Sequence, residues 1–138
     1  MAGELRRPNG IVLSRDEKLL YVADSDAESF YVFDVQPGGT AADRREFAHL
    51  AEITRTDKGM NIGVAGIAIV RDDGLYCISH AGIEVFSPKG EPVGIIPVPV
   101  KAHNLAFARK ERKTLDVVGH GYVYKLRMLA QRFERRSK

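Results

Sequence analysis

Three segments of the chain repeat one pattern, and each places a chemically informative position near its start. Asn9 stands there in PNGIVLSRDEKLLYVADS, Ala65 in VAGIAIVRDDGLYCISH and His103 in HNLAFARKERKTLDVVGH. An asparagine amide oxygen can ligate a divalent cation, and an imidazole can line a substrate pocket and donate a hydrogen bond. Because the three positions are equivalent in the repeat, we expect them to face one common pocket.

The predicted pocket is poor in the groups that hydrolytic chemistry requires. A calcium ion binds about six to eight oxygen atoms, several of them from carboxylates. Asn9 offers one neutral oxygen, and Ala65 offers none. Metal-assisted hydrolysis also needs a base that takes up a proton. We therefore assign no catalytic residue in this chain and expect no metal to bind to it alone.

The other acidic, histidine and cysteine residues follow no metal-ligand spacing. The segment DSDAES at 24–29 alternates acidic residues as a calcium loop does, but Val35 stands where the terminal glutamate belongs. We predict a turn there. His80, His103, His120 and Cys77 show no zinc-type spacing, and Cys77 is expected to point away from the pocket.

The elements that must position these residues are short strands. Each repeated segment has an apolar strand, a charged turn and a strand of β-forming residues, and a third strand follows at 29–35, 82–88 or 122–126. Four-stranded repeats of about 40 residues are typical of propeller blades. We predict an all-β fold, a single partial β-propeller domain over 1–138 with about three four-stranded blades. The blade-like units cover 9–50, 64–98 and 103–127, and a basic tail covers 128–138.

The composition argues against two classes of partner. The formal net charge of +3 arises in the tail, where 127–138 hold five basic residues and one acidic residue, so the rest of the chain is close to neutral. A chain-wide basic surface for nucleic acid is absent. No apolar run is long enough to span a membrane, and MAGELRRPNG at 1–10 does not have the apolar run that a signal peptide needs. A cytoplasmic location is the default expectation, although a longer parent protein could carry an upstream signal.

These segments, together with FYVFDVQPGGT, GIEVFSPKGEPVGIIPVP and GYVYKLRMLAQRF, resemble the senescence-marker-protein/gluconolactonase/luciferin-regenerating-enzyme family, which includes regucalcin. The resemblance covers nearly the whole chain and corresponds to the C-terminal half of the family's fold. It implies a six-bladed β-propeller with a divalent metal, most often calcium, in the central channel. It also implies hydrolysis of lactones or related esters of sugar acids. The metal is held by a glutamate, asparagines and an aspartate that also acts as base or nucleophile.

Only some of the family's site residues have a counterpart in this sequence. Asn9 matches the family's asparagine ligand, and His103 is expected to line the substrate pocket. The position of the aspartate is held by Ala65. A different pairing, through TDKGM, would place Asp57 there instead. The glutamate and a further asparagine would come from the front half of the propeller, which this sequence does not include.

The resemblance leaves two functions open. The chain is expected to be the C-terminal part of a metal-dependent lactone hydrolase, incomplete or inactive alone, with calcium bound only in a complete propeller. The alternative is a non-catalytic binding or interaction module, or a truncated gene product. Because three blades cannot close a ring, we expect either the front half or a second copy in a homodimer to complete it.

Overall fold

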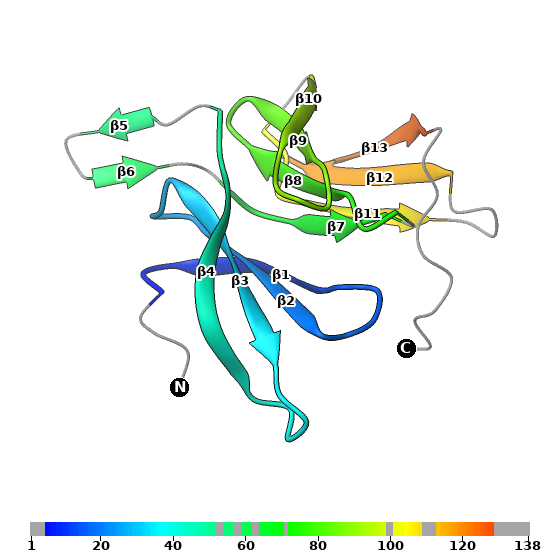
Figure 1. Ribbon diagram of the computed structural model, residues 1–138. Coiled ribbons are helices and arrows are strands. Elements are labelled where there is room, and N and C mark those ends of the chain that lie inside the picture. Colours follow the sequence, from blue (N-terminus) through cyan, green and yellow to red (C-terminus); the bar gives the residue numbers. More distant parts are fainter. Residues whose placement is uncertain are drawn as a thin grey trace.

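Strands account for the regular structure of the chain in a computed structural model (Figure 1). The structure describes residues 5–51, 54–56, 59–61, 64–70, 72–98, 101–108 and 113–128, with the backbone alone for 54–56 and 59–61. No helix occurs among these residues, and hence none that could cross a membrane. The predicted all-β fold is confirmed.

The first sheet contains four strands in chain order, each antiparallel to the next. They are β1 (Pro8–Leu13), β2 (Leu19–Asp24), β3 (Ser29–Val35) and β4 (Ala41–His49). The charged turn between β1 and β2 is held by Ser14, whose hydroxyl donates to Asp16 Oδ1 at 2.7 Å and accepts the Leu19 N–H at 2.9 Å. DSDAES forms the β2–β3 turn, as the sequence predicts.

The second and third sheets follow the same plan. The second contains β7 (Ile67–Ile69), β8 (Leu75–Ser79), β9 (Gly82–Phe86) and β10 (Pro92–Ile96). The third contains β11 (Asn104–Ala108), β12 (Thr114–Gly119) and β13 (Tyr122–Arg127), so it has three described strands rather than four. A small hairpin of β5 (Thr54–Thr56) and β6 (Gly59–Asn61) lies between the first two sheets in the sequence.

The first strands of the three sheets lie side by side, with β7 between β1 and β11 (Figure 1). Gly10 and Gly66 occupy equivalent positions and allow this approach. A Cβ atom on Gly10 would clash with the Ala65 carbonyl oxygen, and one on Gly66 would clash with Asn104 Oδ1. Each glycine thus lets the next sheet's first strand come into close contact.

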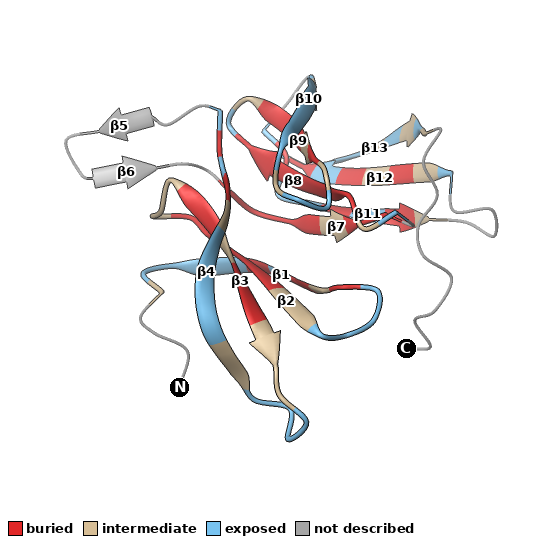
Figure 2. Cartoon of the chain, in the orientation of Figure 1, coloured by how far each residue is buried: buried red, intermediate tan, exposed pale blue. Residues whose placement is uncertain are grey.

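Two apolar cores form between neighbouring sheets, and Figure 2 colours the buried residues of these sheets red. Side chains of the first and second sheets form one core, among them Phe30, Leu75 and Phe86. Side chains of the second and third sheets form the other, among them Ile78 and Leu115. The second sheet therefore packs through both of its faces, since side chains alternate between the two faces of a strand.

Strand β8 shows this alternation at the single cysteine of the chain. Cys77 is fully buried in the first core, whereas its neighbour Tyr76 packs in the second core against Phe107, with ring centroids 5.6 Å apart. Cys77 is not among the described residues that line the pocket at the starts of β1, β7 and β11. Burial, followed by the nearby charge of Glu84, raises the pKa of the Cys77 thiol.

Several large apolar side chains remain exposed on the third sheet and on β10 (Figure 2). Tyr122 and Val123 on β13 are 63% and 64% exposed, and Val93 on β10 is 68% exposed. Within the part of the chain that the structure describes, β13 pairs only with β12 and so has an open edge. Exposed apolar side chains and an open edge are features of a surface that another strand or domain can cover.

Candidate functional site

The three positions singled out in the sequence meet at one pocket. It has a volume of about 210 Å³ and lies where the first strands of the three sheets begin. We call it the axial pocket. Its lining residues are Asn9, Gly10, Ile11, Ala65, Gly66, Ile67, His103 and Asn104. The repeat alignment therefore gave the correct placement, whereas the roles of Asn9 and His103 stay predictions.

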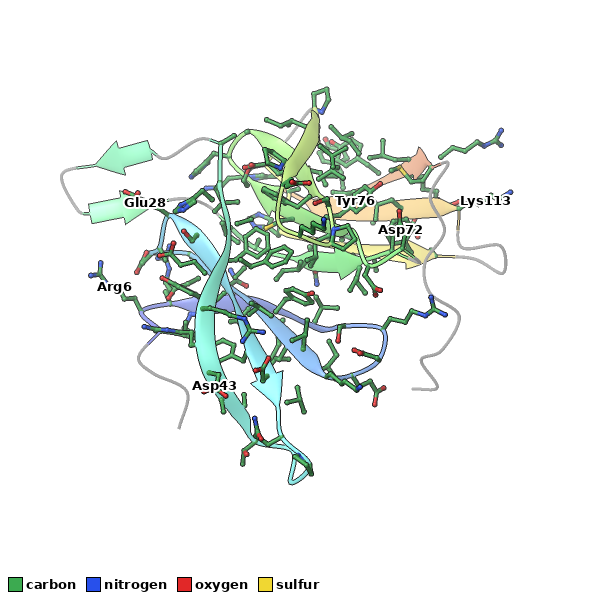
Figure 3. The ribbon with its side chains drawn as sticks, viewed as in Figure 1. Arg6, Glu28, Asp43, Asp72, Tyr76 and Lys113 are labelled. Atoms are coloured by element: carbon green, nitrogen blue, oxygen red, sulfur yellow. The ribbon has the colours of Figure 1, made fainter. Side chains whose placement is uncertain are left out.

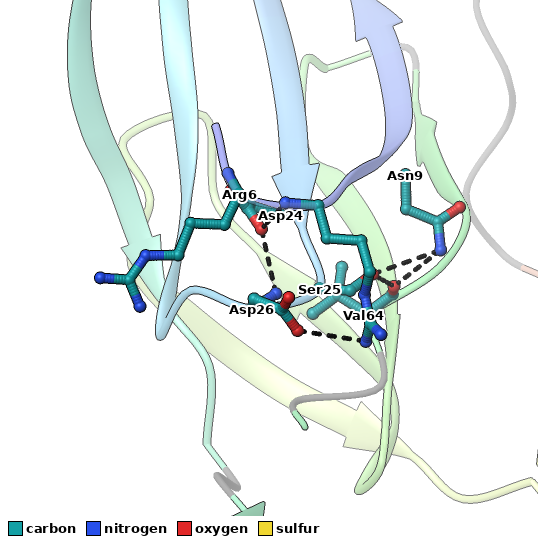
Figure 4. Close-up of polar contacts among 7 residues, drawn as sticks. Arg6, Asn9, Asp24, Ser25, Asp26 and Val64 are labelled. Atoms are coloured by element: carbon teal, nitrogen blue, oxygen red, sulfur yellow. Dashed lines mark hydrogen bonds and ion pairs between the residues drawn. The ribbon is translucent and has the colours of Figure 1, made fainter. Parts of the chain in front are cut away.

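Asn9 is held at the axial pocket through its amide nitrogen (Figure 4). Its Nδ2 donates to Val64 O at 3.2 Å and to Ser25 Oγ at 3.3 Å, and Ser25 Oγ itself donates to Val64 O at 2.7 Å. Among the described residues the Asn9 Oδ1 accepts no hydrogen bond. This leaves a carbonyl oxygen available to a cation or a substrate hydroxyl.

A buried carboxylate close to Asn9 has a structural role. Asp24 is 2% exposed, and it accepts the backbone N–H groups of Arg6 at 2.7 Å, Arg7 at 2.9 Å and Asp26 at 3.0 Å (Figure 4). Its oxygens are thus used within the protein, in fixing the segment that leads into β1. The Arg7 side chain adds an ion pair with Asp26 at 3.2 Å.

The lining of the axial pocket does not fit a calcium ion by itself. Its described lining residues offer amide oxygens and one imidazole but no carboxylate, and Ala65 occupies the place where the family resemblance calls for aspartate. Nowhere in the described ranges do three or more His, Cys, Asp or Glu side chains gather as a metal site would need. Asp57, the other candidate for that aspartate, lies outside the described residues.

His103 has a neighbour that sequence reasoning missed. Its ring centroid lies 5.3 Å from that of His120, in the turn after β12. The His103 backbone N–H donates to Val118 O at 2.8 Å, which extends the β11–β12 pairing to the end of β12. The repeat alignment contained the signal, because an antiparallel partner strand must end where the first strand begins.

A second, wider pocket of about 610 Å³ lies on the outer part of the first sheet. Its lining includes Arg6 and Glu28, both labelled in Figure 3, together with Ser29 and His49. Ser29 Oγ lies 2.8 Å from His49 Nδ1. Because Ser29 is only 3% exposed, its hydroxyl is not open to attack a substrate, and the contact serves to pair β3 with β4.

The fold and the axial pocket define a class of protein. Consecutive antiparallel sheets with adjacent first strands are typical of β-propeller blades, which surround a central channel. The chain belongs to the SMP-30/gluconolactonase/LRE-like family, whose model matches residues 1–120.

Curated proteins of similar sequence support this family assignment. Over 94 residues the chain is 33% identical to a gluconolactonase of Zymomonas mobilis, covering 67% of this chain and 26% of that protein. It is 26% identical to a lactonohydrolase of Aspergillus oryzae, covering 89% of this chain and 32% of that protein. The chain thus spans about a quarter to a third of the curated relatives it matches.

Two solved structures show the same fold. A gluconolactonase from Xanthomonas campestris is 28% identical, with a TM-score of 0.76 over 91% of this chain and 39% of that chain. A calcium-binding regucalcin from Agrobacterium tumefaciens is 15% identical, with a TM-score of 0.76 over 94% of this chain and 48% of that chain. The second likeness concerns the fold alone.

Proposed function

We propose that this chain forms part of the axial pocket of a lactone hydrolase that acts on sugar-acid lactones. The observation that carries the proposal is the meeting of Asn9, Ala65 and His103 in one pocket, at equivalent places of three repeated sheets. Membership of the family and the names of the relatives support the choice of reaction. In this proposal Asn9 faces a divalent cation and His103 lines the substrate pocket.

The proposal assigns no catalytic residue to the described part of the chain. Calcium is the expected metal, because the Asn9 Oδ1, which accepts no hydrogen bond from the described residues, is a hard oxygen ligand. The axial pocket would need carboxylates from outside its described lining to hold that ion. A chain tested alone is therefore expected to bind calcium weakly and to hydrolyse lactone slowly or not at all.

We also propose that further propeller blades complete the axial pocket. They would come either from more of the same polypeptide or from a second copy of this chain. The exposed Tyr122, Val123 and Val93 and the open edge of β13 support a surface that becomes covered. Light scattering distinguishes the sources, since a homodimer doubles the mass of 15.3 kDa and a monomer excludes the second copy.

A non-catalytic binding module is the second candidate. One observation favours it, namely that none of the described residues lining the axial pocket carries a carboxylate and that Ala65 stands at the expected aspartate. Such a module could still bind a sugar acid through the amides of Asn9 and Asn104 and the imidazole of His103.

Replacing Ala65 by aspartate distinguishes the hydrolase proposal from the binding-module proposal. Calcium titration by calorimetry and proton release from glucono-δ-lactone should be measured for the wild type and for Ala65→Asp, with Ala65→Asn as a matched uncharged control. The hydrolase proposal expects calcium affinity to rise about tenfold or more in Ala65→Asp alone, because the carboxylate adds a charged ligand. Equal affinities in all three proteins would favour the binding module.

A further inference from the structure

The three sheets share a local arrangement at the axial pocket. In the first and third sheets, a residue at the start of the first strand or just ahead of it lies beside the residue that follows the second strand. The first sheet pairs Asn9 with Ser25, through the hydrogen bond described above. The third pairs His103 with His120. In the second, the Ala65 N–H donates to Ile78 O, as the His103 N–H does to Val118 O, so Ala65 corresponds to His103.

The third sheet therefore differs from the second by one imidazole. His80 follows β8 as His120 follows β12, but its counterpart ahead of the first strand is an alanine. Only the third sheet has histidine at both places. His80 therefore serves as an internal control for the pair. It is a histidine at the place in the second sheet that His120 occupies in the third, but no second histidine stands opposite it.

The turn that carries His120 has a defined backbone geometry. His120 and Gly121 form a two-residue connection between β12 and β13, with φ angles of 47° and 81°. Positive φ at both central residues defines a type I′ turn, whose twist matches that of the strands it joins. The register from Thr114↔Arg127 to Gly119↔Tyr122 runs without interruption into this turn. His120 is therefore held in place beside His103 by the backbone.

The separation of the two rings suits a shared metal ion. A zinc ion binds an imidazole nitrogen at about 2 Å, so two imidazole centroids around one tetrahedral ion lie about 5 Å apart. The observed distance is 5.3 Å. Both side chains are exposed, and within the described ranges neither imidazole has a hydrogen-bond partner. Their nitrogens are thus accessible to an ion from solvent.

We infer that His103 and His120 form a binding site for a divalent transition-metal ion at the mouth of the axial pocket. Imidazole nitrogen suits zinc, copper and nickel, whereas calcium prefers oxygen, so the site is distinct in chemistry from an oxygen-lined calcium site. Two protein ligands leave the other coordination positions to water or to a small anion. His103 also lines the axial pocket beside Asn9 and Asn104, so a bound ion would lie next to any ligand held there.

Zinc chloride is the probe for this site, and the readout is independent of lactone hydrolysis. Calorimetric titration at pH 7.5, where most imidazoles are unprotonated, should detect one zinc ion per chain. The variants His103→Ala and His120→Ala should each weaken zinc binding about tenfold or more, because each removes one of two ligands. His80→Ala is the matched control and should bind zinc as the wild type does.

A second readout identifies the ligand type. Cobalt(II) bound in place of zinc should give visible absorption bands that disappear in His103→Ala and in His120→Ala but persist in His80→Ala. Circular dichroism confirms that each variant retains its strands. The inference is overturned if the wild type binds no zinc, if either variant of the pair keeps wild-type affinity, or if His80→Ala loses affinity to the same extent.

Discussion

The first and third sheets hold the chain at the axial pocket in different ways. Ahead of β1, the backbone is fixed by a side chain, since the Asp24 carboxylate accepts the N–H groups of Arg6 and Arg7. In the third sheet, Gly119 occupies the place of Asp24, and the segment ahead of β11 packs directly against its backbone, where a Cβ atom would clash with Lys101 O. The same backbone arrangement is thus stabilised by a carboxylate in the first sheet and by close backbone contact in the third.

This difference affects which side chains remain available. In the first sheet the polar side chains are engaged within the protein: Asp24 accepts backbone N–H groups, Ser25 donates to the Val64 carbonyl, and the Asn9 nitrogen donates to both Ser25 and that carbonyl. In the third sheet the backbone contact needs no polar group, and the imidazoles of His103 and His120 keep their nitrogens free within the described chain. Repeated sheets can therefore have the same backbone arrangement and still differ in which side chains are available to bind a ligand.

Replacing Asp24 should give the largest effect on stability. Asp24→Ala leaves three N–H donors without their acceptor, and we expect a loss of about 3 kcal/mol in the free energy of unfolding. Urea denaturation measures it. Asp26→Ala is the control, because its partly exposed ion pair with Arg7 contributes about 1 kcal/mol or less. Equal losses in both variants would contradict the role given to Asp24.

The corresponding change in the third sheet should be smaller. Gly119→Ala places a Cβ atom against the backbone of Lys101 and Ala102, and we expect a loss of about 2 kcal/mol in the same denaturation experiment. Gly94→Ala in β10 is the matched control, because no atom lies within 4 Å of the added Cβ. Should Gly119→Ala prove as stable as Gly94→Ala, the close contact would not be what fixes the segment ahead of β11.

The smallest effect concerns the core that links the first sheet to the second. The pKa of Cys77 is raised in the folded protein, so folding favours the neutral thiol. Its contribution to stability is complete below the unfolded thiol pKa of about 8.5 and is lost as pH rises above that value. We expect the free energy of unfolding to fall by about 1 kcal/mol between pH 8 and 9.5. In Cys77→Ala this fall should be reduced, and an unchanged pH dependence would assign it to other groups.

The repeat made the fold and the pocket predictable. Aligned segments gave the all-β architecture, the order of strands and the positions of Asn9, Ala65 and His103, because equivalent residues of a repeat occupy equivalent places. The His103–His120 contact was missed: the alignment places the end of β12 near the start of β11, but the ring contact also depends on their exact register and on a two-residue turn. Likewise the role of Asp24 depends on backbone groups of Arg6 and Arg7, which precede the recognisable repeat.

The position of the second sheet between the other two has a consequence for how the molecule comes apart. In a row of stacked units, each unit is stabilised by the interfaces it shares with its neighbours. The second sheet contributes to both apolar cores, whereas the first and third contribute to one each. Opening either end of the row disrupts one core, and opening the middle disrupts two. The amide hydrogens of β8, at the centre of that sheet, should consequently be the slowest in the described chain to exchange with deuterated solvent.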